Sequence, residues 1–199
     1  MMQQVITFED LHEVVEALSM ALDAKNSCMC GHSERVAELS LLLAKSMGLS
    51  EAEQVRIHIG AHLHDIGKIG VPDAILTKPG RLTVGEFATI RLHPEIGSNI
   101  VVKVKILHSI IDIVRHHHER VDGNGYPDGL GGDKISLGSR IVAVADAFDA
   151  MTTPRAYRKE LSLTEAIEET IRCRGSQFDP AVVDGLIALA GNNKIPLFG

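Results

Sequence analysis

The spacing of apolar residues predicts helices along almost the whole chain. The first of these carries apolar residues at positions that share one helical face, namely Val14, Val15, Leu18 and Leu22. Thr7 and Asp10 precede them with the spacing of a capping box, in which each side chain bonds the backbone of the other. We therefore expect the first helix to begin after Thr7 and to end near Ala24.

The same period continues through the rest of the chain, and capping residues mark where several helices begin. Ser50 with Glu53, Thr83 with Glu86 and Ser162 with Glu165 repeat the capping-box spacing. Helices are expected near residues 32–47, 50–64, 106–118, 138–151, 162–173 and 179–190. Gly67 and Gly70 are expected to break the helix that carries His64 and Asp65. Strand alternation is missing, so we predict an all-α helical bundle, with at most a small hairpin in the glycine-rich loop at 122–133.

Length and composition fit one compact domain with a short extension. The chain has 199 residues, of which 45% are hydrophobic and 4% aromatic, so it can bury an aliphatic core. We expect an N-terminal helical appendage over residues 1–27 and a main domain over 28–199. The apolar face of the first helix could pack on the core or form the seam of a homodimer, and we favour the core.

Charge narrows the class of ligand. The net charge is −6 and no basic block is present, which argues against a duplex nucleic-acid binder but not against a small anionic ligand. No apolar run reaches the ~18 residues of a membrane span. The first residues do not resemble a signal peptide, and the three cysteines do not suggest a disulfide framework. We therefore expect a cytoplasmic protein without a membrane span.

Histidines and carboxylates form the candidate chemistry. Three consecutive histidines end at His118, immediately before the glycine-rich loop, and imidazole is the commonest metal ligand in proteins. A His64–Asp65 pair alone more often marks an ordinary helix end. The chain has 10 histidines, however, and His32, His93 and Asp146 also lie where helices could converge. A carboxylate can bridge two divalent ions, so this set indicates a metal-dependent hydrolase.

Cations near these residues have two interpretations. Lys68 lies about one turn after Asp65, where it could offset charge on a phosphate or simply interact with a helix dipole. Arg155 and Arg158 follow a Thr-Thr-Pro sequence. They could bind phosphate in a bidentate manner or form a solvated surface pair.

The remaining cysteines and histidines are interpreted as structural. Cys28 and Cys30 are too closely spaced for a usual zinc pair, so we read them as small buried residues, with a metal-binding Cys28 as the alternative. We expect His116 to support the neighbouring ligands without binding the metal itself. The other four are expected to be core or surface residues rather than ligands, namely His12, His58, His62 and His108.

Ordered motifs over most of the chain resemble the HD-GYP family, a branch of the HD-domain phosphohydrolases. They are His32-Ser33-Glu34-Arg35, Leu63-His64-Asp65-Ile66-Gly67-Lys68, His93-Pro94, His117-His118-Glu119-Arg120, Gly125-Tyr126-Pro127, Ala145-Asp146-Ala147-Phe148-Asp149 and Arg155-x-Tyr157-Arg158. The resemblance implies an all-α HD-domain bundle with a Gly-rich GYP loop. It also implies hydrolysis of cyclic di-GMP to linear pGpG or on to GMP, by a hydroxide that bridges two metal ions.

The resemblance also assigns roles to residues. It implies a metal-ligand set of His32, His64, Asp65, His93, His117, His118 and Asp146. Asp65, as the bridging ligand, and Lys68 would be catalytic. Substrate would be bound by Lys68, Arg155 and Arg158. The loop of Gly125, Tyr126 and Pro127 would contact a GGDEF-domain protein.

One departure from the family pattern bears on the number of metals. Members with a third ion carry a glutamate where this chain has Cys28, so we expect a binuclear site and no third ion. The resemblance favours iron or manganese, while nickel and zinc also suit these ligands. Two alternative functions stay open. One is a catalytically weak cyclic dinucleotide sensor or GGDEF-partner scaffold, and the other is a different HD nucleotide phosphohydrolase.

Overall fold

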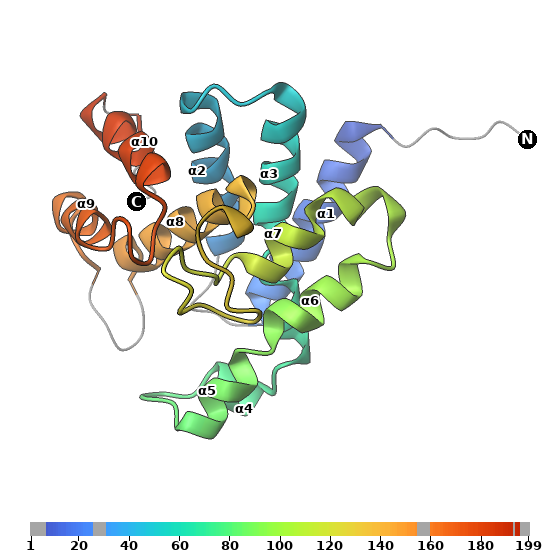
Figure 1. The fold of residues 1–199 in the computed structure, drawn as a ribbon. Helices are drawn as coiled ribbons and strands as arrows, with labels where there is room; N and C mark the ends of the chain where they lie inside the picture. The colour runs from blue at the N-terminus through green and yellow to red at the C-terminus, as the bar shows by residue number, and fades with distance from the viewer. Residues whose placement is uncertain (1–6, 26–30, 155–159, 193, 196–199) are drawn as a thin grey trace, which may run out of the picture.

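Helices make up the regular structure of the chain (Figure 1). The computed structural model describes residues 7–25, 31–154, 160–192 and 194–195. The α-helices are α1 (Phe8–Ala24), α2 (His32–Ser46), α3 (Glu51–Leu63), α4 (Asp73–Leu76), α5 (Val84–Ile90), α6 (His93–Val101), α7 (Ile111–His116), α8 (Leu137–Thr152), α9 (Leu163–Arg172) and α10 (Pro180–Gly191). Short 3₁₀ helices are η2 (Ile66–Gly70), η3 (Lys105–Ile110) and η4 (Gly132–Lys134). The described ranges contain no β-strand, which confirms the predicted all-α class.

Side-chain caps place the helix starts where the sequence predicts them. Thr7, Thr83 and Ser162 each form a complete capping box, at the starts of α1, α5 and α9. The predicted helix at 106–118 is wrong as a single unit. It divides into η3 and α7 at Ile110, whose backbone angles of φ −107° and ψ 0° are not α-helical.

The bundle is built around α3, which packs between two apolar clusters. One face of α3 contributes Ile57 and Ala61 to the larger cluster, which includes residues of α2, α7, α8, α9 and α10. The other face contributes Ile59 and Leu63 to a second cluster with α1, η2, α6 and η3. Figure 1 shows α2, α3 and α1 side by side. Because both faces of α3 are buried, the residues at its C-terminal end are held firmly inside the molecule.

The first helix packs on this second cluster, as favoured from the sequence. Val15 and Leu22 are buried, with exposed fractions of 1% and 9%. Val14 and Leu18 face outward instead, at 58% and 47%. The apolar face of α1 is thus divided between the core and the surface.

A close backbone approach joins η2 to α6 at Gly67. A Cβ atom on Gly67 would lie 1.9 Å from the carbonyl oxygen of His93 and 2.5 Å from the amide nitrogen of Gly97. The expectation that Gly67 ends the preceding helix is therefore incomplete, since α3 has already ended at Leu63. Glycine is needed at position 67 because two main chains touch there.

The glycine-rich loop is organised by a buried carboxylate. Asp122 and Gly131 form one isolated antiparallel bridge, so the small hairpin expected from the sequence is reduced to a single bridge. Glu119 is 3% exposed and accepts backbone N–H groups from Asp128 at 2.7 Å and Leu130 at 3.0 Å. Glu119 thus ties the two arms of the loop together.

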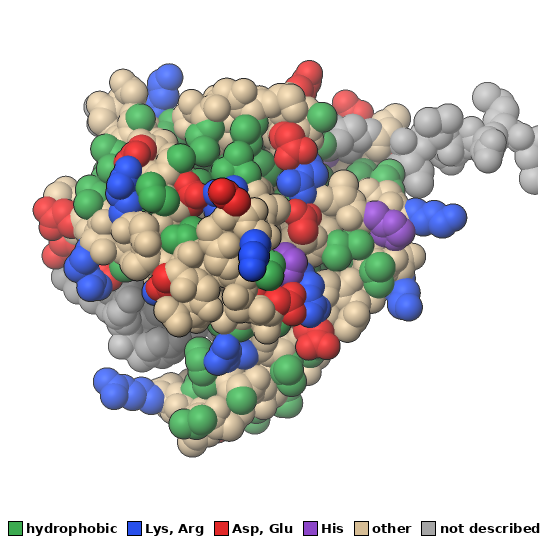
Figure 2. Space-filling view, in the orientation of Figure 1, with side chains coloured by type: hydrophobic (Ala, Val, Ile, Leu, Met, Phe, Trp, Pro, Cys, Tyr) green, Lys and Arg blue, Asp and Glu red, His purple; other side chains and the backbone are tan. Residues whose placement is uncertain are grey.

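The surface carries mixed charge. In Figure 2, acidic and basic side chains are interspersed over the visible face, without an extended area of one sign. Among the helices described, none is long and apolar enough to cross a lipid bilayer.

Candidate metal centre

Asp65 lies at the meeting point of several helix ends, just after α3. Its Oδ1 atom lies 3.1 Å from Nε2 of His93 and 3.8 Å from Nε2 of His117. Its Oδ2 atom lies 3.4 Å from Nε2 of His64 and 3.8 Å from Nε2 of His32. The two oxygens of one buried carboxylate therefore face two different sets of imidazoles.

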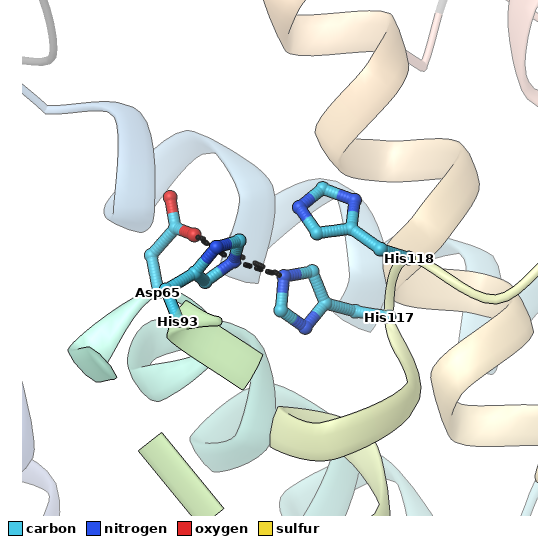
Figure 3. Close-up of side chains that lie close together, drawn as sticks. All are labelled: Asp65, His93, His117 and His118. Carbon is cyan, nitrogen blue, oxygen red and sulfur yellow. Dashed lines mark hydrogen bonds and ion pairs between the residues drawn. The ribbon is translucent and has the colours of Figure 1, made fainter. Parts of the chain in front are cut away.

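These sets form two groups whose ligand atoms are close enough to share an ion. In the first, Asp65, His93, His117 and His118 bring one ligand atom each to within 4.8 Å of one another. Figure 3 shows these side chains pointing toward a common space. In the second, His32, His64 and Asp146 meet the same distance limit, and His32 Nε2 lies 3.4 Å from Asp146 Oδ1. The structure thus brings together every metal ligand implied by the resemblance.

Helix ends explain how these side chains converge. His32 is the first residue of α2 and follows Gly31, whose φ of +68° turns the chain into the helix. His64 is the C-cap residue of α3, and His93 is the first residue of α6. His117 is the C-cap residue of α7. Only Asp146 comes from a helix interior, that of α8.

Backbone carbonyls fix the orientation of three imidazole rings. Nδ1 of His64 lies 2.7 Å from the carbonyl oxygen of Ala61, and Nδ1 of His93 lies 2.7 Å from that of Ile90. His117 repeats the contact over 3.0 Å with a carbonyl oxygen of its own helix. A carbonyl can only accept, so Nδ1 carries the proton and Nε2 presents its lone pair to the centre. This is the usual arrangement of metal-binding histidines.

Unsatisfied polar atoms show that these residues fit a metal. Nε2 of His32 and Nε2 of His64 are buried without a hydrogen-bond partner among the described residues. Leaving such atoms unpaired costs about 1–3 kcal/mol each, so a native fold rarely tolerates several together. The donor set of imidazoles and carboxylates suits a divalent ion of intermediate hardness.

Electrostatics give most of these groups the protonation state that a metal requires. Burial alone would raise the pKa of Asp65, but Lys68 and His64 hold it well below its usual range. Burial lowers the pKa of His118 to about 3. It also lowers that of His117, with help from His118 and His64 nearby. Carboxylates stay ionised and these imidazoles stay neutral, as coordination demands.

Two other imidazoles behave differently in the metal-free protein: burial would lower the pKa of His64, but Asp65 raises it, and His32 is shifted in the same direction. Burial would lower the pKa of His32, but the nearby carboxylates of Asp146 and Asp149 raise it to about 9. A proton and a metal ion would therefore compete for the Nε2 atom of His32 near neutral pH.

A pocket opens beside the first group. Its volume is about 360 Å³, within the usual range of small-molecule sites, and its lining includes His118, Asp146, Arg91, Tyr126 and Phe87. The Tyr126 ring lies 4.8 Å from the His118 ring, centroid to centroid. The Arg91 guanidinium lies over the same Tyr126 ring, 4.5 Å from its centroid. The pocket therefore offers aromatic faces and a cation next to the candidate metal centre.

The Gly125–Pro127 turn lies against the chain segment that carries these histidines. A Cβ atom on Gly125 would lie 2.5 Å from the amide nitrogen of Arg120 and 2.7 Å from the carbonyl oxygen of His118. Tyr126 and Pro127 are half-buried. The GYP segment thus forms one wall of the pocket.

Lys68 contacts the centre from η2. Its Nζ atom donates to Asp65 Oδ2, and its side chain is 20% exposed. The ammonium group therefore lies next to the shared carboxylate and keeps access to solvent.

Two residues that support the centre were missed from the sequence. Asp149 lies one turn after Asp146 and accepts the Nδ1 proton of His32 over 2.7 Å. Arg35 in turn donates to both Asp149 oxygens, at 2.5 and 3.2 Å. Both residues belong to motifs of the HD-GYP resemblance. The spacing of three residues between Asp146 and Asp149 indicated that both carboxylates lie on the same side of the helix. Periodicity alone does not say which side chain a buried carboxylate will meet.

The other predicted residues lie apart from the centre or outside the described ranges. Arg155, Arg158, Cys28 and Cys30 fall outside the described residues. His116 bonds Asp128 at 2.9 Å, and the exposed His108 bonds the Val102 carbonyl at 2.9 Å.

Three histidines interpreted separately from the sequence are neighbours in the fold. His12 and His58 are half-buried and His62 is buried, as expected for core or surface residues. Their rings lie 4.7 to 5.3 Å apart, centroid to centroid, which the sequence analysis did not predict.

Comparisons with known proteins agree with this geometry. The HD domain family matches residues 16–182. A cyclic di-GMP phosphodiesterase from Thermotoga maritima is 43% identical over 92% of this chain, and a 3'3'-cGAMP-specific phosphodiesterase of Vibrio cholerae is 40% identical over 77%. The chain spans 50% and 34% of these two relatives.

A solved structure shows the same fold. The crystal structure of a cyclic GMP-AMP-specific phosphodiesterase from Vibrio cholerae superposes with a TM-score of 0.71 at 21% identity, and the match covers 93% of this chain and 50% of that one. Family match, motif order and fold agree along nearly the whole length described. The chain belongs to the HD domain family, in its HD-GYP branch.

Proposed function

We propose that this chain is a metal-dependent phosphodiesterase that hydrolyses cyclic di-GMP at a binuclear centre. The observation that carries the proposal is the position of Asp65, whose two oxygens face two separate ligand groups. A carboxylate in that position can bridge two ions. The cyclic di-GMP phosphodiesterase of Thermotoga maritima, at 43% identity, supports the substrate class.

The residues present would hold two ions. The first ion would be bound by Asp65, His93, His117 and His118, and the second by His32, His64, Asp146 and the other oxygen of Asp65. When bound, two ions about 3.5–4 Å apart lower the pKa of water and polarise a phosphoryl group. Iron and manganese are the ions that we expect first, with nickel and zinc also compatible with the ligands. The expected absence of a third ion depends on Cys28 and stays a prediction.

The other residues of the pocket would bind and orient the substrate. Lys68 would place its ammonium group against a phosphoryl oxygen, where it offsets the charge that develops during in-line hydrolysis. Phe87 would offer a ring face on which a purine can stack. Arg91, whose guanidinium lies over the Tyr126 ring, would approach a phosphate. The roles of Arg155 and Arg158 in holding the second phosphate stay predictions.

The first step of hydrolysis breaks one P–O3′ bond of the ring. Water supplies the new P–O bond, and the released 3′ oxygen takes a proton, which leaves the linear dinucleotide pGpG. A second hydrolysis of the remaining diester would give GMP.

A second substrate is favoured by one specific observation. The 3'3'-cGAMP-specific phosphodiesterase of Vibrio cholerae is 40% identical to this chain. Both cyclic dinucleotides present two phosphodiesters and two purines, so the metal centre alone does not distinguish them. The choice between guanine and adenine depends on contacts to the base edges.

One paired measurement tests the proposal. Metal content per chain is determined by elemental analysis, and cyclic di-GMP turnover by the same preparation is followed by chromatography. We expect about two ions per chain and formation of pGpG or GMP. The same assay is repeated with 3'3'-cGAMP and with a linear dinucleotide as substrates.

The outcomes separate the alternative functions. If the protein binds two ions and hydrolyses 3'3'-cGAMP but not cyclic di-GMP, the proposed substrate changes to another cyclic dinucleotide. Tight binding of cyclic di-GMP without product, in metal-replete protein, would identify a sensor. The same preparation also tests the GGDEF-partner and homodimer expectations, by gel filtration with and without a purified GGDEF domain.

A further inference from the structure

A second cluster of histidines lies between α1 and α3, outside the catalytic centre. His12 comes from α1, whereas His58 and His62 lie one turn apart on α3. One ring nitrogen of each residue lies within 4.8 Å of those of the other two. We refer to these three residues as the histidine triad.

One ring of the triad repeats the orientation seen at the candidate metal centre. Nδ1 of His58 lies 3.2 Å from the carbonyl oxygen of Ala37, so this atom carries the proton and Nε2 presents a lone pair. Nε2 of His58 faces Nε2 of His12 at 2.9 Å. On the other side of its ring, Nδ1 of His12 lies 4.0 Å from the Glu16 carboxylate. A carbonyl partner at Nδ1, as His58 has, usually orients a metal-binding histidine, whereas the 4.0 Å at His12 exceeds hydrogen-bond length.

A buried, unsatisfied atom gives an independent reason to expect a ligand. His62 is 3% exposed, and its Nδ1 atom has no hydrogen-bond partner among the described residues. An imidazole nitrogen buried in this way costs free energy unless something occupies its lone pair or takes its proton. The rings of His12 and His58 lie 5.3 and 4.7 Å from the His62 ring, centroid to centroid.

An ion could reach the triad from solvent. His12 and His58 line a pocket of about 310 Å³, together with Glu51, Lys45 and Gln54. Tetrahedral zinc with Zn–N distances of about 2.0–2.1 Å needs ring nitrogens about 3.3 Å apart, so modest side-chain rotation would bring the three atoms into position. A water molecule would complete four-coordination from the pocket side.

We propose that the histidine triad is a second metal site, which binds a borderline divalent cation such as Zn²⁺ and ties α1 to α3. Three imidazole ligands without a carboxylate favour zinc, copper or nickel over magnesium, calcium or manganese. The site is separate from the catalytic ligands, so the proposal does not depend on the identity of the substrate.

The test compares zinc binding by full-length variants. Each protein is stripped with a chelator, reloaded with Zn²⁺ in slight excess and dialysed, and zinc per chain is measured. We expect His12→Gln to lose about one ion per chain relative to the unsubstituted protein. Glutamine keeps the hydrogen bond to His58 but is a poor zinc ligand, so the loss reports coordination. His108→Gln is the matched control, because His108 is exposed and bonds a single backbone carbonyl.

Equal zinc content in His12→Gln and the unsubstituted protein would overturn the proposal. A second measurement decides the matter if His12→Gln does not fold. Crystals of the unsubstituted chain grown with Zn²⁺ are examined by anomalous diffraction. A peak next to the three rings supports the site, whereas peaks at the catalytic centre or on the surface alone exclude it.

Discussion

The candidate metal centre and the histidine triad use the same residue type in opposite electrostatic settings. At the centre, His32 lies next to Asp146 and Asp149, and these carboxylates raise its pKa to about 9 despite burial. In the triad, burial lowers the pKa of His62 to about 3, with His58 and His12 alongside. Burial disfavours the imidazolium form in both places, so the neighbouring charges decide the sign of the shift.

Because of this difference, the two clusters suit different numbers of metal ions. Carboxylates neutralise part of the charge of bound ions and can bridge two of them, which suits a reactive binuclear centre. Three imidazoles without a carboxylate suit a single ion, with water in the fourth position. The predictions below test that contrast, beginning with the largest expected effect.

Asp65→Asn should have the largest effect on activity. The substitution keeps the shape of the side chain but removes the negative charge shared by the two ligand groups. We expect turnover of cyclic di-GMP to fall about 10³-fold or more, with loss of bound metal. Elemental analysis and product chromatography measure both, with His108→Gln as the control. A variant that kept its metal and its turnover would contradict the bridging role of Asp65.

Lys68→Met should separate chemistry from metal binding. Lys68 donates to Asp65 and keeps access to solvent, so we assign it to the phosphoryl group rather than to an ion. Its loss should lower kcat about 10²–10³-fold while metal content stays unchanged. If metal content falls instead and kcat per bound metal is preserved, Lys68 serves only to hold Asp65.

Asp149→Asn should weaken metal binding through its effect on His32. The carboxylate accepts the Nδ1 proton of His32 over 2.7 Å and is itself held by Arg35. Removal of such a partner typically costs about 10–100-fold in metal affinity. Competition with a chromogenic chelator measures the change. Asp184→Asn is the matched control, since Asp184 is an exposed aspartate paired with Arg174, and unchanged affinity in Asp149→Asn would refute the role.

The smallest effect concerns the pH dependence of stability in the metal-free chain. The folded-state pKa of His62, about 3, lies below its ordinary value of 6.5. Its contribution to stability is therefore complete above pH 6.5 and is lost as pH falls toward 3. His32 has the opposite sign, because its contribution is complete below 6.5 and is lost as pH rises through about 9.

His62→Leu tests the acid side of this profile. The variant removes one titrating group and keeps an apolar side chain in the same place. We expect its thermal midpoint to fall a few degrees less than that of the unsubstituted chain between about pH 7 and pH 5. Parallel profiles for the two proteins would show that the burial of His62 does not contribute to acid sensitivity.

Local signals predicted most of the fold. Capping pairs such as Thr83 with Glu86 depend on residues three positions apart, so the sequence states them directly. The break at Ile110 was missed because the apolar period continues through it. Packing against the second core cluster, where Ile110 is 1% exposed, competes there with local helix preference.

Long-range convergence was accessible only through family resemblance. Asp146 lies 3.4 Å from His32, yet more than a hundred residues separate them, and periodicity does not specify that contact. The histidine triad was missed for the same reason. His58 and His62 share a helical face, which was visible in the sequence, but the approach of His12 from α1 depends on how two helices pack.

The contact at Gly67 has a consequence for the geometry of the candidate metal centre. His93 is the first residue of α6, and a methyl group at position 67 would overlap its carbonyl oxygen at 1.9 Å. Any larger residue there must push α6 away from η2 and change the separation of His93 from Asp65. An amino acid with no functional group thus sets the distance between two ligands of the candidate metal centre.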